Sequence, residues 1–537
     1  MLNTKNNLII FIYFFIICSI GILSFSDYGI STDEHDTRIT GFVSLKYIFT
    51  IFFSNSVNKI DQIIKLPDIN EWIDSVGIIF NLPMALLEFI FKVEDSRNYY
   101  LFRHLANFLI FFISVYFFFL LILRRFNSIF LALLGSTFFI ASPRIFAHSF
   151  YNNKDIVFMS LFIIGLFSAI NFLEKPNYKN SMIFSLIVSL AIDVRIMGIF
   201  LPMLFSVLIL INILREKKYK KIALKPFFTF LLLTPLFIIL FWPYLWDNPI
   251  NNFIYMYKHL KNIDVDIYNF YFGQYINSET LPWHYPLVWI IITTPIFYTI
   301  LFLIGSAFIL RRFIKRLFKI EKNDSYKDLW RGKNELKDLI FLSSFIIPLV
   351  AVINFNSSLF DGWRHLYFIY PSFLMISLFG LNLIKILLFK KKENLFVISI
   401  IIIILPTIIW MYNNHPHQYV YFNNLAGKNF NKKFEMDYWG LSNVNALNYI
   451  ANNTNKNVLV SSLGTSNLPI SKTFLIKEYR NKITITHDVK NADFLINNYR
   501  DFSSKPANEK FIVPSNFNVI HELKVDDITI NTIYKKK

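Results

Sequence analysis

An acidic cluster directly follows the first apolar segment of the chain. The stretch "DYGISTDEHDTRITGF", residues 27–42, holds Asp33, Glu34, His35 and Asp36 just beyond the run "LIIFIYFFIICSIGILSF". Carboxylates in such a place can remove a proton from a hydroxyl group or hold a divalent cation. The alternative interpretation of one acidic pair is a solvated loop with no chemical role.

Two further acidic positions stand at the edges of later apolar runs. Asp155 opens the run in "YNNKDIVFMSLF", where it is either a functional group or a cap for the orphan N–H groups of a helix start. Asp193 and Arg195 lie in "LAIDVRIMGIFLP" with apolar residues on both sides. That pair predicts either a mutual salt bridge or an arginine that binds phosphate.

A fourth polar group is divided between two aromatic segments. His284 lies in "PWHYP", and Asp361, Arg364 and His365 lie in "DGWRHLY". The tryptophans and tyrosines are expected at a membrane interface, so the arginine and the histidines carry more weight. All four groups are predicted on the same side of a membrane, where one cavity could collect them. A base together with a phosphate-binding arginine suits group transfer from a lipid-phosphate donor.

Composition indicates the class of protein that must position these residues. Of the 537 residues, 54% are hydrophobic and only 17% are charged, and the mean hydropathy is +0.44. These values predict a polytopic α-helical membrane protein. The single cysteine, Cys18, excludes disulfides within the chain and cysteine-based metal sites.

The net charge of +18 lies in short blocks between apolar runs, such as "REKKYKK" at 215–221 and "RRFIKRLFK" at 311–319. This pattern is typical of cytoplasmic loops and argues against a nucleic-acid partner. Alternating sides predict about 11 transmembrane helices, with the N-terminus in the cytoplasm. Their expected ranges are 8–26, 101–123, 128–142, 156–172, two short spans within 181–213, 224–241, 286–309, 338–354, 366–386 and 395–411.

Two regions fall outside this pattern of spans. Residues 27–99 are predicted as a long outer segment, with an amphipathic piece at 77–91 lying on the membrane surface. From about residue 413 the long apolar runs stop, so residues 1–412 are predicted as the membrane core. Residues 413–537 are predicted as a small extracytoplasmic α/β domain with a helix at 443–453, strands at 457–464, 482–488 and 492–499, and a hairpin at 517–534.

Several of these segments resemble one family of membrane enzymes. The acidic pair past the first helix is similar to the "DE" of GT-C integral membrane glycosyltransferases of the protein O-mannosyltransferase and aminoarabinose-transferase type. "YYLFRHLANFLIFFISVYF", "FIASPRIFAHSFYNNKDIVFMSLF" and "SLIVSLAIDVRIMGIFLP" resemble later family segments and match Arg103, Asp155 and Arg195 to them. "LPWHYPLVWIIITTPIF" and "FDGWRHLYFIYPS" are similar to a bacterial branch of glycosyltransferase family 39-like proteins.

The resemblance implies an inverting transfer of a sugar from a polyprenyl-phosphate-linked donor to a hydroxyl acceptor at the outer face of a bacterial inner membrane. Asp33 would be the general base, whose carboxylate could keep an ordinary pKa, and Glu34 would orient the base or the sugar. Substrate-binding candidates are Asp155, Arg195, Arg364, His365, His284 and Arg103. No cofactor is certain, and a divalent cation is possible only if the fold brings the carboxylates together.

Two other functions are compatible with these observations. A secondary transporter would use intramembrane charges, although such charges usually lie near the midplane of repeated halves, and no repeat is found here. In a membrane-anchored binding protein, the outer C-terminal domain would carry the function. The acceptor is open, since a protein, a lipid or a glycan can each offer a hydroxyl.

Overall fold

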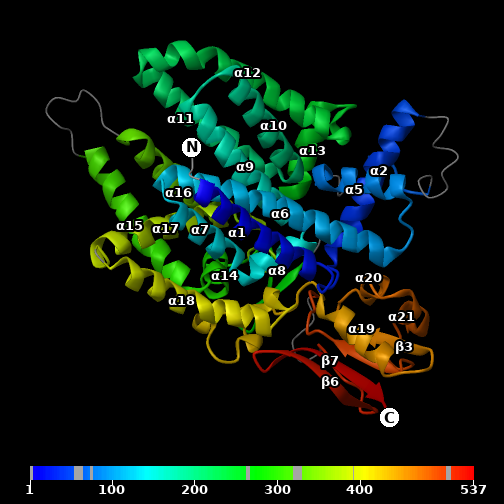
Figure 1. Ribbon diagram of the computed structural model, residues 1–537. Coiled ribbons are helices and arrows are strands. Elements are labelled where there is room, and N and C mark those ends of the chain that lie inside the picture. The colour runs from blue at the N-terminus through cyan, green and yellow to red at the C-terminus, as the bar shows by residue number, and fades with distance from the viewer. Residues whose placement is uncertain are drawn as a thin grey trace.

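The structure is a computed structural model that describes residues 4–53, 65–72, 77–261, 266–318, 329–390, 392–503 and 510–537. Helices form most of the described residues up to Asn413, and a small sheet with short helices forms the end of the chain. Figure 1 shows this C-terminal part, in orange and red, gathered at one side of the helical part. The predicted fold class, a helical membrane protein with a small C-terminal α/β unit, is confirmed.

Nine helical segments in the described part of the chain are long and apolar enough to cross a membrane. They comprise α1 (Thr4–Ser24), α6 (Ser96–Phe126), α9 (Asp155–Glu174), α11 (Phe200–Arg215), α12 (Lys217–Phe241), α15 (Ile296–Phe318), α16 (Gly332–Asn354), α17 (Tyr370–Leu388) and α18 (Glu393–Asn413). Short 3-10 turns, η1 (Ile196–Ile199) and η3 (Arg364–Ile369), extend α11 and α17 at their starts.

The difference from the eleven predicted spans lies at three places. The expected span 128–142 is the first half of a bent pair, α7 (Ile129–Ile140) and α8 (Pro143–Tyr151), which meet at 69° and would make a tenth span. Helix α10 (Tyr178–Val194) has 17 residues and is shorter than each of the nine segments, since α11 forms its segment together with η1 and reaches 20 residues. The expected span 286–309 is divided near Pro295 into α14 (Tyr285–Thr293) and α15, because proline disfavours helical geometry in the residue before it.

The predicted outer segment 27–99 contains two described helices, of which α5 (Ile78–Phe91) coincides with the amphipathic piece expected at 77–91 and α2 (Asp33–Phe52) was not expected. Helix α2 begins at the acidic cluster, and α5 packs against it. Gly41 permits this close approach, since a Cβ at that position would lie 2.2 Å from the carbonyl oxygen of Asn81. Carboxylates in the first turn of α2 interact favourably with the helix dipole, so the cluster also helps to start this helix.

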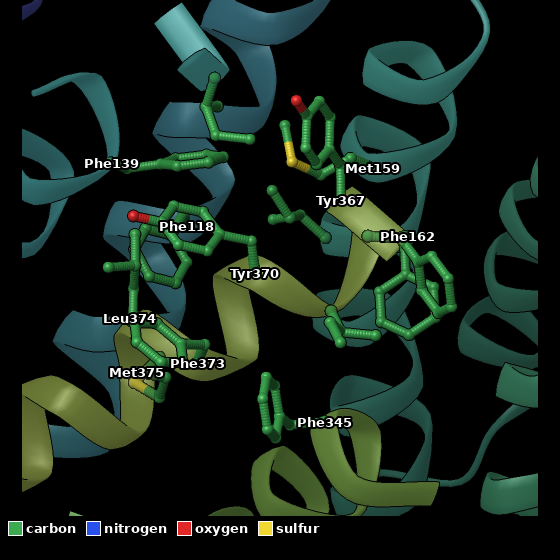
Figure 2. Close-up of a cluster of buried hydrophobic side chains, with 14 of the residues drawn as sticks. Phe118, Phe139, Met159, Phe162, Phe345, Tyr367, Tyr370, Phe373, Leu374 and Met375 are labelled. Atoms are coloured by element: carbon green, nitrogen blue, oxygen red, sulfur yellow. The ribbon is translucent and has the colours of Figure 1, made fainter. Parts of the chain in front are cut away.

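An apolar cluster in the interior supports the start of η3 and α17. Figure 2 shows side chains of α6, α7, α9, α16, η3 and α17 meeting there, with Tyr367 and Tyr370 among them. Phe118 and Phe139 pack edge to face with ring centroids 5.3 Å apart, and the Tyr370 hydroxyl lies 2.7 Å from Ser142 Oγ. Burial of each large apolar side chain stabilises the fold by about 1.5–3 kcal/mol. This packing fixes the segment that follows Arg364.

Helix α9 is buried along most of its length and carries an acidic residue at each end. At its C-terminal end, Glu174 pairs with Arg124 and with Lys337 Nζ at 3.2 Å. Nearby, Asp338 binds Arg125 and Arg312. The 20 residues of α9 span about 30 Å, which is the thickness of the hydrocarbon core of a bilayer.

The C-terminal sheet has the strand order β4-β3-β5-β7-β6. Strands β3 (Val458–Ser462), β4 (Ile483–Ile485) and β5 (Phe494–Asn497) are parallel, and β6 (Phe517–Val525) and β7 (Ile528–Lys536) form an antiparallel hairpin. Its helices are α19 (Ser442–Asn452), α20 (Leu468–Thr473) and α21 (Lys477–Lys482). The predicted strands, hairpin and first helix are confirmed.

Two irregular regions connect the sheet unit to the helices. The segment between α18 and α19 holds the turns η4 (Gln418–Val420), η5 (Asn424–Ala426) and η6 (Phe430–Lys432), and most of its aromatic residues belong to the main helical core. The segment between α12 and α14 holds η2 (Pro243–Leu245), α13 (Pro249–Lys261) and a hairpin of β1 (Tyr268–Tyr271) and β2 (Gln274–Asn277).

Candidate active site

Asp33 and Glu34 lie side by side in the first turn of α2 but contact different neighbours. Asp33 Oδ2 lies 3.4 Å from Nη1 of Arg364, and its side chain is 40% exposed. Glu34 is buried, with Oε1 2.8 Å from His104 Nε2, and its Oε2 accepts hydrogen bonds from the backbone N–H and hydroxyl of Ser31. Successive helical residues point about 100° apart, which separates the two carboxylates.

Asp155 begins α9 and is held by two arginines. Arg364 Nη1 lies 3.2 Å from its Oδ2, and Arg195 Nη2 binds its Oδ1. Asn152 also donates a hydrogen bond to Oδ2 and accepts one from the Asp155 backbone N–H. The Asp155 side chain is only 1% exposed. It is therefore a buried carboxylate fixed by cations, which a helix cap alone does not require.

Arg364 joins three carboxylates at the start of η3. Besides Asp33 and Asp155, it binds Asp361, whose Oδ2 lies 3.2 Å from Nη2. Its guanidinium lies 4.8 Å from the ring centres of Phe360 and Trp439, and its side chain is 3% exposed. The Nε of Arg364 has no hydrogen-bond partner among the described residues. We call Asp33, Asp155, Arg195, Asp361 and Arg364 the charged network.

The surroundings of Asp33 change its acidity. Loss of water around the carboxyl raises the pKa of Asp33 above its ordinary value of 3.8, and the charges of Asp361 and Asp155 act in the same direction. Arg364 and Lys154 oppose this rise. The expectation that Asp33 could keep an ordinary pKa is therefore wrong, because partial burial of its carboxyl and the charges of Asp361 and Asp155 together raise its pKa.

Arg195 and His365 lie at the edge of the charged network. Arg195 follows α10 and pairs with Asp155, whereas the carboxylate oxygens of Asp193 have no hydrogen-bond partner in the described part of the chain. The salt bridge between Asp193 and Arg195 considered from the sequence is not formed. His365 adjoins Arg364 and packs edge to face on Phe360, with centroids 4.6 Å apart.

Two predicted residues lie in other contacts. His284 Nδ1 is 2.7 Å from the Tyr271 hydroxyl, next to the exposed Trp283. Arg103 is buried on α6, with its Nε 2.6 Å from Glu88 Oε1, and Arg38 binds the other oxygen of Glu88. Within the ranges that the structure describes, neither His284 nor Arg103 pairs with a residue of the charged network.

Several residues beside the network were not among the predicted site residues. Lys154 precedes Asp155 and was visible in the same motif. His148 lies against the hydroxyl of Tyr438 at 2.9 Å and against Asn152 at 3.1 Å, and Asn152 holds Asp155. The tyrosine comes from a segment 290 residues further along the chain, so no local pattern could have paired it with the histidine.

The three carboxylates around Arg364 do not form a set of metal ligands. Across the described ranges, no group of three or more His, Cys, Asp or Glu side chains could hold a metal ion. Asp33, Asp155 and Asp361 each bind the same guanidinium, which occupies the place between them. The arrangement suits a base held beside arginines better than a carboxylate cage for a divalent cation.

Comparison with known proteins gives matches among solved structures. No protein-family model matches the chain, and no curated protein does. The structure of ArnT from Cupriavidus metallidurans bound to undecaprenyl phosphate is 10% identical, covers 99% of this chain and 98% of that one, and has a TM-score of 0.44. The apo structure of the same protein is 11% identical, covers 92% and 94%, and has a TM-score of 0.46.

Proposed function

We propose that this chain is a membrane glycosyltransferase that moves a sugar from a polyprenyl-phosphate-linked donor to a hydroxyl acceptor. The observation that carries the proposal is the different environment of two carboxylates bound to one arginine. Asp33 is 40% exposed and reachable, while Asp155 is 1% exposed and neutralised by Arg364 and Arg195. Such a division gives one carboxylate a chemical role and the other a positioning role.

In the proposed step, Asp33 takes the proton of the acceptor hydroxyl as its oxygen attacks the anomeric carbon of the sugar. The bond from that carbon to the phosphate oxygen breaks, and its electron pair leaves with the polyprenyl phosphate. The transfer inverts the anomeric carbon because attack and departure occur on opposite sides. Cations near the departing phosphate stabilise the charge that develops there.

Arg195 is the arginine best placed to meet that phosphate. Its side chain is 21% exposed, whereas Arg364 is 3% exposed and already binds three carboxylates. The Nε of Arg195 lacks a hydrogen-bond partner in the described part of the protein. We assign Arg195 to binding the donor phosphate, and Arg364 to holding Asp33 and Asp155 in place. His365, which packs on Phe360 next to Arg364, supports this arrangement. We assign Glu34 and Arg103 to the packing of α2, α5 and α6.

The charged residues at the two ends of α9 indicate which side of the membrane the site faces. The charged network lies at the N-terminal end of this helix, and the ion pairs of Glu174 lie at the other end. Basic residues gather at the Glu174 end, in the last turns of α6 and α15. By the positive-inside rule that end faces the cytoplasm. The proposed reaction then takes place on the extracytoplasmic face of a bacterial inner membrane.

The direct test is a transfer assay with the purified full chain in lipid vesicles. Polyprenyl-phosphate-linked pentoses and hexoses are supplied with a cell-envelope extract that contains protein, lipid and glycan hydroxyls. We expect labelled sugar to move to an acceptor while free polyprenyl phosphate is released. Solute flux across the vesicle membrane without any sugar transfer would favour the transporter and reject the enzyme.

Arg195→Gln should raise the KM for the donor with a smaller effect on the KM for the acceptor. One charge-assisted hydrogen bond contributes about 1.5–3 kcal/mol, so we expect a rise of about 10–100-fold. The matched control is Arg38→Gln, since Arg38 has the same 21% exposure and also binds a buried carboxylate, Glu88. Equal donor KM values in the two variants would remove Arg195 from the phosphate site.

The acid limb of the pH profile should lie above the ordinary range of an aspartate. Asp33 acts as a base only when ionised, and its pKa is raised. Activity is therefore complete above the raised pKa and falls as the pH decreases through it. The measurement is kcat/KM against pH, and an acid limb at or below pH 3.8 would contradict the assignment.

A further inference from the structure

Arg500, from the C-terminal sheet unit, reaches the charged network. Its Nη2 lies 3.0 Å from Asp361 Oδ1, while Asp361 Oδ2 lies 3.2 Å from Nη2 of Arg364. Asp361 is thus shared by two guanidinium groups, one from the sheet unit and one from η3. All three side chains are buried. Buried charges of this kind persist only where each has its partner.

The sheet presents Arg500 through two adjoining loops. Strands β3 and β5 are parallel neighbours, so their carboxyl ends lie at the same edge, where α/β sheets usually bind ligands. The loop after β3 lies against the loop after β5, because Thr465 N–H donates a hydrogen bond to Arg500 O at 3.0 Å. Gly464 makes this contact possible, since its Cβ would lie 2.4 Å from the same oxygen. The Arg500 side chain is directed to the helical part.

The backbone around Asp361, which binds Arg500, is also held in place by hydrogen bonds. Asp361 has a positive φ of 58°, a backbone conformation that costs energy outside glycine and needs support from its surroundings. Asn269 of β1 supplies it by accepting a hydrogen bond from Asp361 N–H at 3.2 Å and donating one to Leu359 O at 3.1 Å. Arg500 Nη1 also binds Glu435. The position of Asp361 is therefore set from two sides.

We infer that Arg500 is a positioning residue for sugar transfer, which acts through Asp361 to hold Arg364 beside Asp33 and Asp155. This inference rests on the proposed function. With Arg500 present, the charge of Asp361 is divided between two arginines, and Arg364 keeps its contacts to the other carboxylates. Without it, Asp361 draws Arg364 toward itself and away from Asp33, and the base loses its support.

The experiment compares Arg500→Met and Arg500→Lys with Arg480→Met in the full chain. Arg480 is the matched control, because it also ties the sheet unit to the helical part, through Asp95 and Ser96, yet has no contact with the charged network in the described residues. We expect kcat/KM to fall by about 10²-fold in Arg500→Met, mainly through kcat, as for a misplaced catalytic group. Arg500→Lys keeps the charge but not the two-sided contact, so we expect a smaller loss.

The pH profile separates positioning from a purely structural role. Asp33 is faced by Arg364, Lys154, Asp155 and Asp361, and the charge of Asp361 raises its pKa. Loss of Arg500 leaves that charge less neutralised, so the acid limb of kcat/KM should move to higher pH in Arg500→Met. In Arg500→Lys the acid limb should lie closer to that of the unaltered chain, and in Arg480→Met it should be unchanged. A structural role would lower thermal stability in both Met variants without moving the limb.

Two outcomes would overturn the inference in distinguishable ways. Equal kcat/KM values and equal acid limbs in Arg500→Met and Arg480→Met would reject it, while sugar transfer by the unaltered chain would keep the proposed function. Absence of sugar transfer by the unaltered chain would reject both. Where Arg500→Met does not fold, the comparison of Arg500→Lys with the unaltered chain decides, and an unchanged kcat/KM in that variant rejects the inference.

Discussion

Asp33→Asn should lower the rate of sugar transfer by about 10²–10⁴-fold, the usual contribution of a general base. Asparagine has nearly the same shape but cannot accept the proton of the acceptor hydroxyl. The change leaves Asp155 and Asp361 on Arg364, so the fold and donor binding should be kept. The measurement is kcat at saturating donor, together with the dissociation constant of the donor.

The control for this variant lies in the same turn of α2. Asp36→Asn removes an exposed carboxylate three residues further on, and we expect transfer to continue at nearly the unaltered rate. A rate for Asp33→Asn within a few fold of that control would show that another group takes the proton. A donor dissociation constant that rises as much as kcat falls would show that Asp33 binds substrate.

Arg364→Met should destabilise the protein by about 3–5 kcal/mol and abolish transfer. Removal of one partner from a buried ion pair leaves an uncompensated charge, and here three carboxylates lose the same cation. Asp155 keeps Arg195 and Asp361 keeps Arg500, so the loss stays near this range. The apparent midpoint of thermal unfolding in detergent micelles and the transfer rate are the two measurements.

Two further variants serve as controls for the loss of stability in Arg364→Met. Arg316→Met removes an arginine that binds Glu335 near the other end of the helices, where both side chains are about one-fifth exposed, and should cost about 0–1 kcal/mol. Arg364→Lys keeps the charge but offers fewer donors to three carboxylates, so its stability should lie between the two. Equal unfolding midpoints for Arg364→Met and Arg316→Met would mean that the network does not stabilise the fold.

The apolar runs and the strands were predictable because each follows a local rule. A run of about 20 apolar residues suits a span, and short β-branched runs between turn residues suit strands. Helix α2 was missed because it is rich in polar residues, and α8, which begins at Pro143, was missed because it has only nine residues. Both helices are stabilised by packing against distant segments, which no local pattern records.

The composition of the site was predictable in part. Charged residues at the ends of apolar runs were expected to meet. In the structure, Asp33 and Asp155 both pair with Arg364, and Asp155 also pairs with Arg195. Their contacts join positions up to 331 residues apart, since 364 − 33 = 331. Whether a residue next to these positions joins the charged network depends on the direction of its side chain. Glu34 adjoins Asp33 in the sequence but points to His104 instead. The roles proposed for Asp33 and Asp155 depend on how far each side chain is exposed to solvent, and this exposure is known only from the folded structure.

Helix α9 is held at both ends, by arginines at Asp155 and by Arg124 and Lys337 at Glu174. The helix is therefore fixed in position inside the protein, and its ends are held about 30 Å apart. In a thinner or thicker membrane, this helix cannot slide to match the lipid. The adjustment falls to the lipid-facing helices α1, α12 and α18, which are largely exposed, and to local deformation of the bilayer around them. The distance between the two charged ends is thus set by the protein and not by its lipid surroundings.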